Sequence, residues 1–142
     1  MHEIKTEITI NTDIKKVWEI LSDFANYPSW NSFFKHISGE LATDEILSIT
    51  VAPPGSKPMS FSPILVEVVE FGAIRWRGKL FTKWIFQGEH YLALDKLSEQ
   101  QTKFIHGEKF SGLLSSVFKW IGALDKTKKG FKLFNGDLKR RS

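Results

Sequence analysis

The stretch that decides the fold is residues 103–138, KFIHGEKFSGLLSSVFKWIGALDKTKKGFKLFNGDL. Its first part alternates with a period of two, which is typical of a β-strand with one buried face. The residues that share that face are Phe104, His106, Glu108 and Phe110. After Ser111-Gly112 the apolar spacing becomes helical, and the stripe runs through Leu114, Val117, Phe118, Ile121, Leu124, Phe131, Phe134 and Leu138. This change predicts a last strand and then one helix from Leu113 to about Lys139, ~40 Å long, which Gly130 weakens or bends.

The segments before this stretch indicate further strands and two short helices. Residues 2–10 alternate as a half-buried strand, and Asn11-Thr12-Asp13 supplies N-cap residues for a helix that ends near Ser22. A second short helix or turn, interrupted by Pro28, is expected at 24–30. The remaining strands are expected at 33–40, 45–51, 61–70, 74–78, 90–94 and 103–110, with a loop at 53–58.

This order predicts an α+β fold in which a curved antiparallel sheet of about seven strands wraps around the long C-terminal helix. Consecutive strands joined by short turns favour antiparallel pairing. The last helix is the only element large enough to cover the apolar face of the sheet. The length of 142 residues is that of one domain, expected at 1–142.

The composition restricts the class of protein. The 12 Phe, 5 Trp and 2 Tyr suit a large core, and they also suit the walls of an apolar pocket. The absence of cysteine excludes disulfides, thiolate nucleophiles and cysteine-based metal sites. The N-terminus does not resemble a signal peptide, and no apolar stretch reaches the ~18 residues of a membrane span. These features predict a cytoplasmic protein that does not insert stably into membranes.

The net charge of +4 is concentrated at the C-terminal end, where residues 125–142 hold seven cations and two acids. We interpret this excess as the solvated face of the helix and its basic end. Nucleic acid is not an expected partner, because Trp and Phe alternate with the cations and therefore lie on the opposite sheet face. The sequence contains no glycine-rich phosphate loop, dinucleotide fingerprint or nucleophile elbow, so no cofactor is predicted.

Four segments resemble a known superfamily when their order and spacing are taken together. They are the first strand into NTDIKKVW at 11–18, YPSWN at 27–31, WRGKL at 76–80, and the GEH of 88–90 through the FSG of 110–112 into the long helix. The chain resembles the superfamily of START lipid-transfer domains, birch-pollen-type allergens and the polyketide cyclase/dehydrase and lipid-transport family, in particular its small bacterial single-domain members. The resemblance implies a helix-grip fold with a cavity for lipids, polyketides, hormones or quinones, or a surface for partner proteins.

Three titratable residues form the most suggestive group. His106 and Glu108 share a face with Phe104 and Phe110, and His90 shares one with Leu92 and Leu94 on the strand expected beside it. A desolvated glutamate has a raised pKa and can exchange protons, with a histidine as its partner. Glu108, His106 and His90 are therefore the catalytic candidates. The alternative is that they are hydrogen-bonded structural groups, with Arg75 and Arg77 as partners of the glutamate; a metal site is not predicted.

Aromatic and aliphatic residues complete the predicted pocket. Trp30 is expected near its mouth, and Trp84 lies in an unusually apolar loop at 80–86 that either covers the pocket or folds onto the core. Asn31 either contacts the ligand or caps a turn. The pocket body is predicted to consist of Trp76, Leu92, Phe104, Phe110, Val117, Phe118 and Ile121.

Three functional hypotheses follow from this pattern. The first is binding, with transport as a variant, of a hydrophobic small molecule such as a lipid or polyketide. The second is a cyclase or dehydratase that uses Glu108 and a histidine for proton transfer. The third is a module that binds a protein partner through a sheet edge or the basic helix end.

Overall fold

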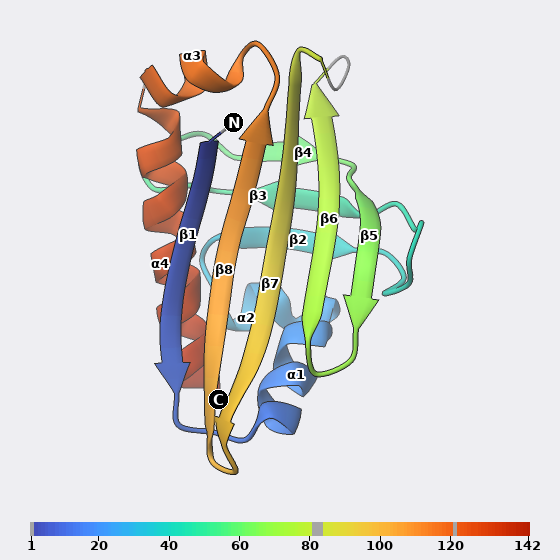
Figure 1. The fold of residues 1–142 in the computed structure, drawn as a ribbon, viewed down its shortest axis with the longest axis vertical. Helices are drawn as coiled ribbons and strands as arrows, with labels where there is room; N and C mark the ends of the chain where they lie inside the picture. Colours follow the sequence, from blue (N-terminus) through green and yellow to red (C-terminus); the bar gives the residue numbers. More distant parts are fainter. Residues whose placement is uncertain (1, 81–83, 121) are drawn as a thin grey trace.

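The fold is seen in a computed structural model that describes residues 2–80, 84–120 and 122–142. Figure 1 shows long strands side by side, with shorter strands that run across behind them and a helix along one side. In chain order the elements are β1 (His2–Ile10), α1 (Ile14–Ser22), the 3-10 turn η1 (Phe24–Asn26), α2 (Tyr27–Trp30), β2 (Phe34–Ser38), β3 (Ser48–Val51), β4 (Met59–Phe61), β5 (Ile64–Val69), β6 (Ala73–Leu80), β7 (Phe86–Ser98), β8 (Gln101–Ser111), α3 (Ser115–Trp120) and α4 (Ala123–Arg141).

The strands form two antiparallel sheets. One has the order β1-β8-β7-β6-β5 and the other the order β2-β3-β4. The chain just before β3 lies beside β5, where the N–H of Leu65 donates to the carbonyl of Glu45 at 2.9 Å and the N–H of Leu47 donates to that of Pro63 at 2.8 Å. The α+β architecture with antiparallel strands and a long C-terminal helix confirms the prediction.

The strand predicted at 61–70 is two strands. β4 ends at Phe61 and β5 begins at Ile64, with Pro63 between them. Proline has no backbone N–H to donate to a ladder, so it separates the two pairings. As a result β4 joins the second sheet and β5 ends the first, and the described residues contain eight strands instead of about seven.

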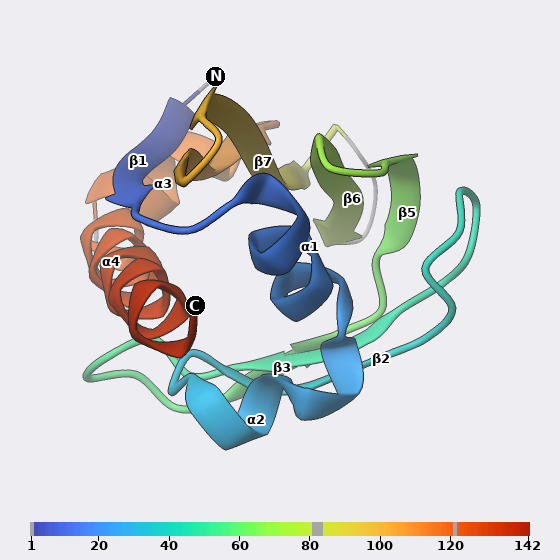
Figure 2. The ribbon, with the colours of Figure 1, turned by 90° about the horizontal axis from the view of Figure 1, so that it is seen from below.

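The short helices close the lower end of the interior. Asp13 caps α1, as predicted, because its side chain accepts a hydrogen bond from the N–H of Lys16 at 2.9 Å. The buried face of α1 carries Val17, Trp18 and Leu21. Seen from below, the two sheets face each other, α4 lies along one side and α1 lies across the lower end (Figure 2).

The C-terminal helix is broken, which corrects the prediction of one helix from Leu113. Gly122 adopts a φ of 80° between α3 and α4, a left-handed conformation that glycine accepts without strain. Gly130, the predicted bend, lies inside α4 and is buried. There it allows close packing, because a Cβ at this position would lie 2.5 Å from the ring of Phe33.

Aromatic rings fill the lower half of the interior. The ring of Phe134 on α4 lies 5.2 Å from that of Phe34 on β2, 5.7 Å from Tyr27 and 6.0 Å from Phe104 on β8. The ring of Phe34 also lies 5.9 Å from that of Trp76. These rings come from both sheets, from α2 and from α4, so this part of the interior is solid core.

Candidate functional site

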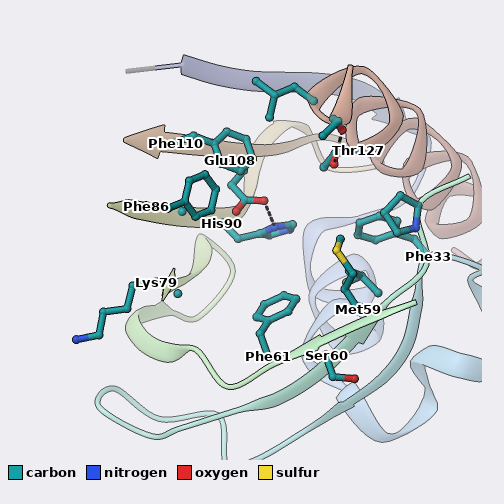
Figure 3. A pocket seen from close by; sticks show the side chains of 16 residues that line it. Phe33, Met59, Ser60, Phe61, Lys79, Phe86, His90, Glu108, Phe110 and Thr127 are labelled. Atoms are coloured by element: carbon teal, nitrogen blue, oxygen red, sulfur yellow. Dashed lines mark hydrogen bonds and ion pairs between the residues drawn. The ribbon is translucent and has the colours of Figure 1, made fainter. Parts of the chain in front are cut away.

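A cavity of about 300 Å³ occupies the upper half of the interior. Its walls come from the upper ends of β7 and β8, from β4 and the loop before it, and from the first turns of α4 (Figure 3). Most of the wall is apolar, with Phe33, Met59, Phe61, Phe86, Phe110 and Leu124 among its residues. This volume lies at the small end of the ~300–1,000 Å³ range of ligand pockets.

Two polar side chains, Glu108 and His90, meet at the wall of this cavity. They lie opposite each other on β8 and β7, where the strand register pairs them. Glu108 Oε1 lies 3.3 Å from His90 Nδ1, and the side chains are 20% and 5% exposed. The second carboxyl oxygen, Oε2, lies over Gly88, where any side chain would displace it. The missing side chain at Gly88 therefore leaves room for the carboxyl group at the cavity wall.

The contact continues into the core as a chain of hydrogen bonds. His90 Nε2 lies 2.7 Å from His106 Nε2, and His106 Nδ1 lies 3.0 Å from Oδ1 of Asn135 on α4. The amide nitrogen of Asn135 donates to Thr6 Oγ1 at 2.8 Å, and that hydroxyl donates to the backbone carbonyl of His106 at 2.8 Å. This series of hydrogen bonds thus links the cavity wall to three strands and the C-terminal helix.

Burial shifts the pKa of each titratable side chain in this series of hydrogen bonds. Desolvation raises the pKa of Glu108 to about 8 and lowers the pKa of His90 to about 3. Burial, followed by the neighbouring His90, also holds the pKa of His106 well below its usual value. At neutral pH both rings are therefore uncharged, and Glu108 retains its proton. A neutral carboxylic acid at an apolar wall can exchange a proton with a bound molecule.

Sequence comparison places the whole fold in one family. The model of the family described as polyketide cyclase/dehydrase and lipid transport matches residues 1–140. The chain belongs to this family. No curated protein matches the chain in sequence.

Solved structures of low sequence identity share the fold of this family member. The Zhui aromatase/cyclase from Streptomyces sp. R1128 is 12% identical with a TM-score of 0.73, over 99% of this chain and 94% of that one. A START superfamily protein from Mycobacterium smegmatis is 19% identical with a TM-score of 0.69, over 100% of both chains. The di-domain aromatase/cyclase BexL is 13% identical with a TM-score of 0.70, and this chain spans 48% of its length. These neighbours support the helix-grip fold that the sequence predicts for the family.

Three of the predicted pocket residues line the cavity of this family member: His90, Glu108 and Phe110. Trp76, Leu92 and Phe104 face the interior, as alternation predicts, but they are fully packed in its solid part. Trp76, for example, stacks on the His90 ring at 4.6 Å. His106 is fully buried and reaches the cavity only through His90.

The predicted residues of the helices and loops that the structure describes lie away from the cavity. Val117 is 48% exposed, because the break at Gly122 turns α3 out of line with α4. Trp84 is 74% exposed, and Trp30 packs on Tyr27 and Phe134 at 5.1 Å each, below the cavity. Ile121, the side chain of Phe118 and residues 81–83 of the predicted covering loop lie outside the described residues.

The structure shows the contacts of the polar residues for which the sequence allows two roles. Asn31 Oδ1 accepts hydrogen bonds from the N–H groups of Phe33 at 3.0 Å and Phe34 at 2.7 Å, so it caps the turn. Arg75 and Arg77 pair with Glu67 and Glu89 and do not reach Glu108. Within the described chain, no three His, Cys, Asp or Glu side chains are grouped to hold a metal ion, and no helix is long and apolar enough to span a membrane.

Sequence reasoning missed Asn135 and much of the cavity wall. Asn135 lies four residues after Phe131 and three before Leu138, and both of these belong to the predicted apolar stripe. A polar residue on the buried face of a helix needs a partner, so this spacing was a usable signal. Phe33, Met59 and Phe61 carried no comparable signal, because their place in the wall depends on how the second sheet crosses the first.

Proposed function

We propose that this protein binds a hydrophobic small molecule, such as a lipid, a polyketide or a similar ring compound, in the cavity between β4, β7, β8 and α4. The observation that carries this proposal is the apolar-walled cavity of about 300 Å³, which has the Glu108–His90 pair on its wall. Ligand sites typically combine apolar walls with a few placed polar groups. The membership of a family described by polyketide cyclases and lipid transport supports the same class of ligand.

The first test is native mass spectrometry of the purified protein, followed by organic extraction and identification of any bound compound. A co-purifying hydrophobic molecule would support the proposal. The second test is titration with an uncharged fluorescent probe such as N-phenylnaphthylamine, which should bind saturably at one site.

A matched pair of variants locates that site. Ala123→Phe places a ring in the cavity wall at the start of α4, and it should abolish probe binding. Leu133→Phe places the same ring on the exposed side of the same helix, and it should leave binding unchanged. Equal probe binding by both variants, with no compound extracted, would contradict the proposal.

The contact between Glu108 and His90 favours a second candidate function, a cyclase or dehydratase of polyketide-like substrates. Its acid–base step would use Glu108 at the cavity wall with His90 behind it. Loss of water from an incubated β-hydroxy ketone, followed by mass, would test this activity. Glu108→Gln should then reduce the rate by about 10²–10⁴-fold while the fold survives. The hypothesis of a protein partner has less support, because it predicts an interior filled by side chains, whereas this interior contains a cavity.

A further inference from the structure

The hydrogen-bond chain behind Glu108 has a direction that can be derived from its buried end. The backbone carbonyl of His106 can only accept, so the Thr6 hydroxyl, 2.8 Å away, must donate its proton to it. The oxygen of that hydroxyl then accepts from its other partner, Asn135, 2.8 Å away. The group of Asn135 that faces Thr6 is therefore its NH₂ group, and its carbonyl oxygen faces His106.

The next link fixes the proton on each imidazole ring. The carbonyl oxygen of Asn135 accepts, so His106 Nδ1, at 3.0 Å, carries the proton of the neutral ring. His106 Nε2 is then an acceptor. Because His90 Nε2 lies 2.7 Å from it, that nitrogen must be the donor. The proton of the neutral His90 ring is thus on Nε2, and its Nδ1 has only a lone pair.

The last link concerns the carboxyl group. His90 Nδ1 can only accept, and its partner at 3.3 Å is Glu108 Oε1. A contact between two acceptors is unfavourable, so Oε1 carries the proton of a neutral carboxylic acid. Burial, which favours the neutral form of both Glu108 and His90, acts in the same direction. The remaining oxygen, Oε2, lies over Gly88 at the cavity wall and has only lone pairs to offer.

We infer that the chain Thr6–Asn135–His106–His90 holds the proton of Glu108 on Oε1, so that Oε2 faces the cavity as a hydrogen-bond acceptor and the site selects apolar ligands that carry a hydroxyl group. Asn135 is the positioning residue of this arrangement. The ligand class rests on the proposed binding function, whereas the proton arrangement is a property of the free protein. An anionic group is disfavoured at this position, because its oxygens would meet the acceptor Oε2.

The proton arrangement can be tested directly on the free protein. Long-range ¹H–¹⁵N NMR spectra separate protonated from unprotonated ring nitrogens of histidine. We expect a protonated Nδ1 on His106 and a protonated Nε2 on His90. The opposite tautomer on either ring would overturn the inference, since Glu108 would then present a donor to the cavity.

The ligand preference can be tested with three probes of similar size: naphthol, its methyl ether and methylnaphthalene. The ether can only accept a hydrogen bond, and methylnaphthalene can do neither. Naphthol should bind roughly tenfold more tightly than both of the others, as expected for one added hydrogen bond to a partner in the wall. Equal binding of naphthol and its ether would overturn the preference. Binding of none of the three would overturn the proposed function, while the ring spectra would still decide the proton arrangement.

Asn135→Leu tests whether the chain causes the preference. Without the Asn135 oxygen, His106 keeps only the backbone of Phe131 as a hydrogen-bond acceptor. Its tautomer is then held less firmly, so Glu108 can present a donor or an acceptor. The preference for naphthol over its ether should fall from roughly tenfold to about twofold or less, and the ring spectra should show the change. Lys132→Leu places the same side chain on the exposed face of the same helix and is the control, with both measurements unchanged. If the folded Asn135→Leu protein keeps the roughly tenfold preference, the hydrogen-bond chain does not cause it. If this variant does not fold, the ring spectra and the probe series on the unmodified protein still test the inference.

Discussion

At the scale of single residues, Glu108 sets the alkaline side of the pH dependence of stability. Its pKa rises from 4.5 to about 8 on folding, so the folded protein holds a proton there that the unfolded chain has released. Stability from this group is therefore fully present below pH 4.5 and is lost as the pH rises towards 8. His90 and His106 act oppositely, because their lowered pKa values mean that stability is lost as the pH falls below 6.5. The combined effect is a maximum of the unfolding free energy near pH 6.5.

We predict that Glu108→Gln removes the alkaline side of this profile. Between pH 6.5 and 8 the contribution of Glu108 falls while those of the two histidines level off, and the unmodified protein should lose about 1 kcal/mol of unfolding free energy. The glutamine keeps a donor for His90 Nδ1 but does not titrate, so the variant should lose no stability over the same range. Urea denaturation at several pH values measures both profiles. Parallel profiles would mean that Glu108 is already ionised at neutral pH.

At the scale of residues, the sequence predicted the direction of the side chains better than it predicted the groups that surround them. Strand alternation placed His90, His106 and Glu108 on the inner face, and the register from Thr102 to Phe110 runs without a bulge, so the faces are those expected. The alternation could not show that His106 is sealed in the core while Glu108 reaches a cavity. That difference depends on Asn135 and on rings from other elements, which strand periodicity does not describe.

At the scale of elements, the C-terminal region shows how two glycines within one helical pattern have different structural roles. The helical spacing continues across Gly122 and Gly130, so the sequence alone predicts one helix with a bend at its middle glycine. The break lies instead at Gly122, which has a positive φ, and it brings the first turn of α4 to the cavity. Gly130 stays helical, and its missing side chain leaves room for the ring of Phe33.

We predict opposite effects for alanine at two glycines of α4. In Gly136→Ala the new methyl group would lie 3.5 Å from Arg140, an ordinary contact distance. The gain in helix propensity should therefore stabilise the protein by about 0.5–1 kcal/mol. Gly130→Ala makes the same change but forces a methyl group against the Phe33 ring, and it should destabilise by about 1–3 kcal/mol. Urea denaturation compares the two, and Phe33→Leu should relieve the second. Stabilisation by both alanines would show that Phe33 can move aside.

At the scale of the whole molecule, the interior is divided into a solid lower half and a hollow upper half. The lower half is filled by rings from both sheets and α4, around Phe34 and Phe134. The sequence predicted the α+β architecture, since periodicity and element order suffice for that. It could not predict which half is hollow, because this depends on how the second sheet and the first turn of α4 are placed. The predicted pocket therefore included Trp76, Leu92 and Phe104, which belong to the solid half.

This division predicts unequal costs for the same substitution in the two halves. Phe134→Ala removes a ring surrounded on all sides by Tyr27, Phe34, Phe104 and other aromatic groups, so it should cost about 3–5 kcal/mol of unfolding free energy. Phe110 is also buried, but one side of its ring already faces the cavity. Its packing loss is smaller, and Phe110→Ala should cost less by about 1 kcal/mol or more. Both values come from urea denaturation at pH 6.5, where the acid–base contributions are largest. If the two substitutions cost the same, the upper interior is as densely packed as the lower, and a ligand would first have to open the space that it fills.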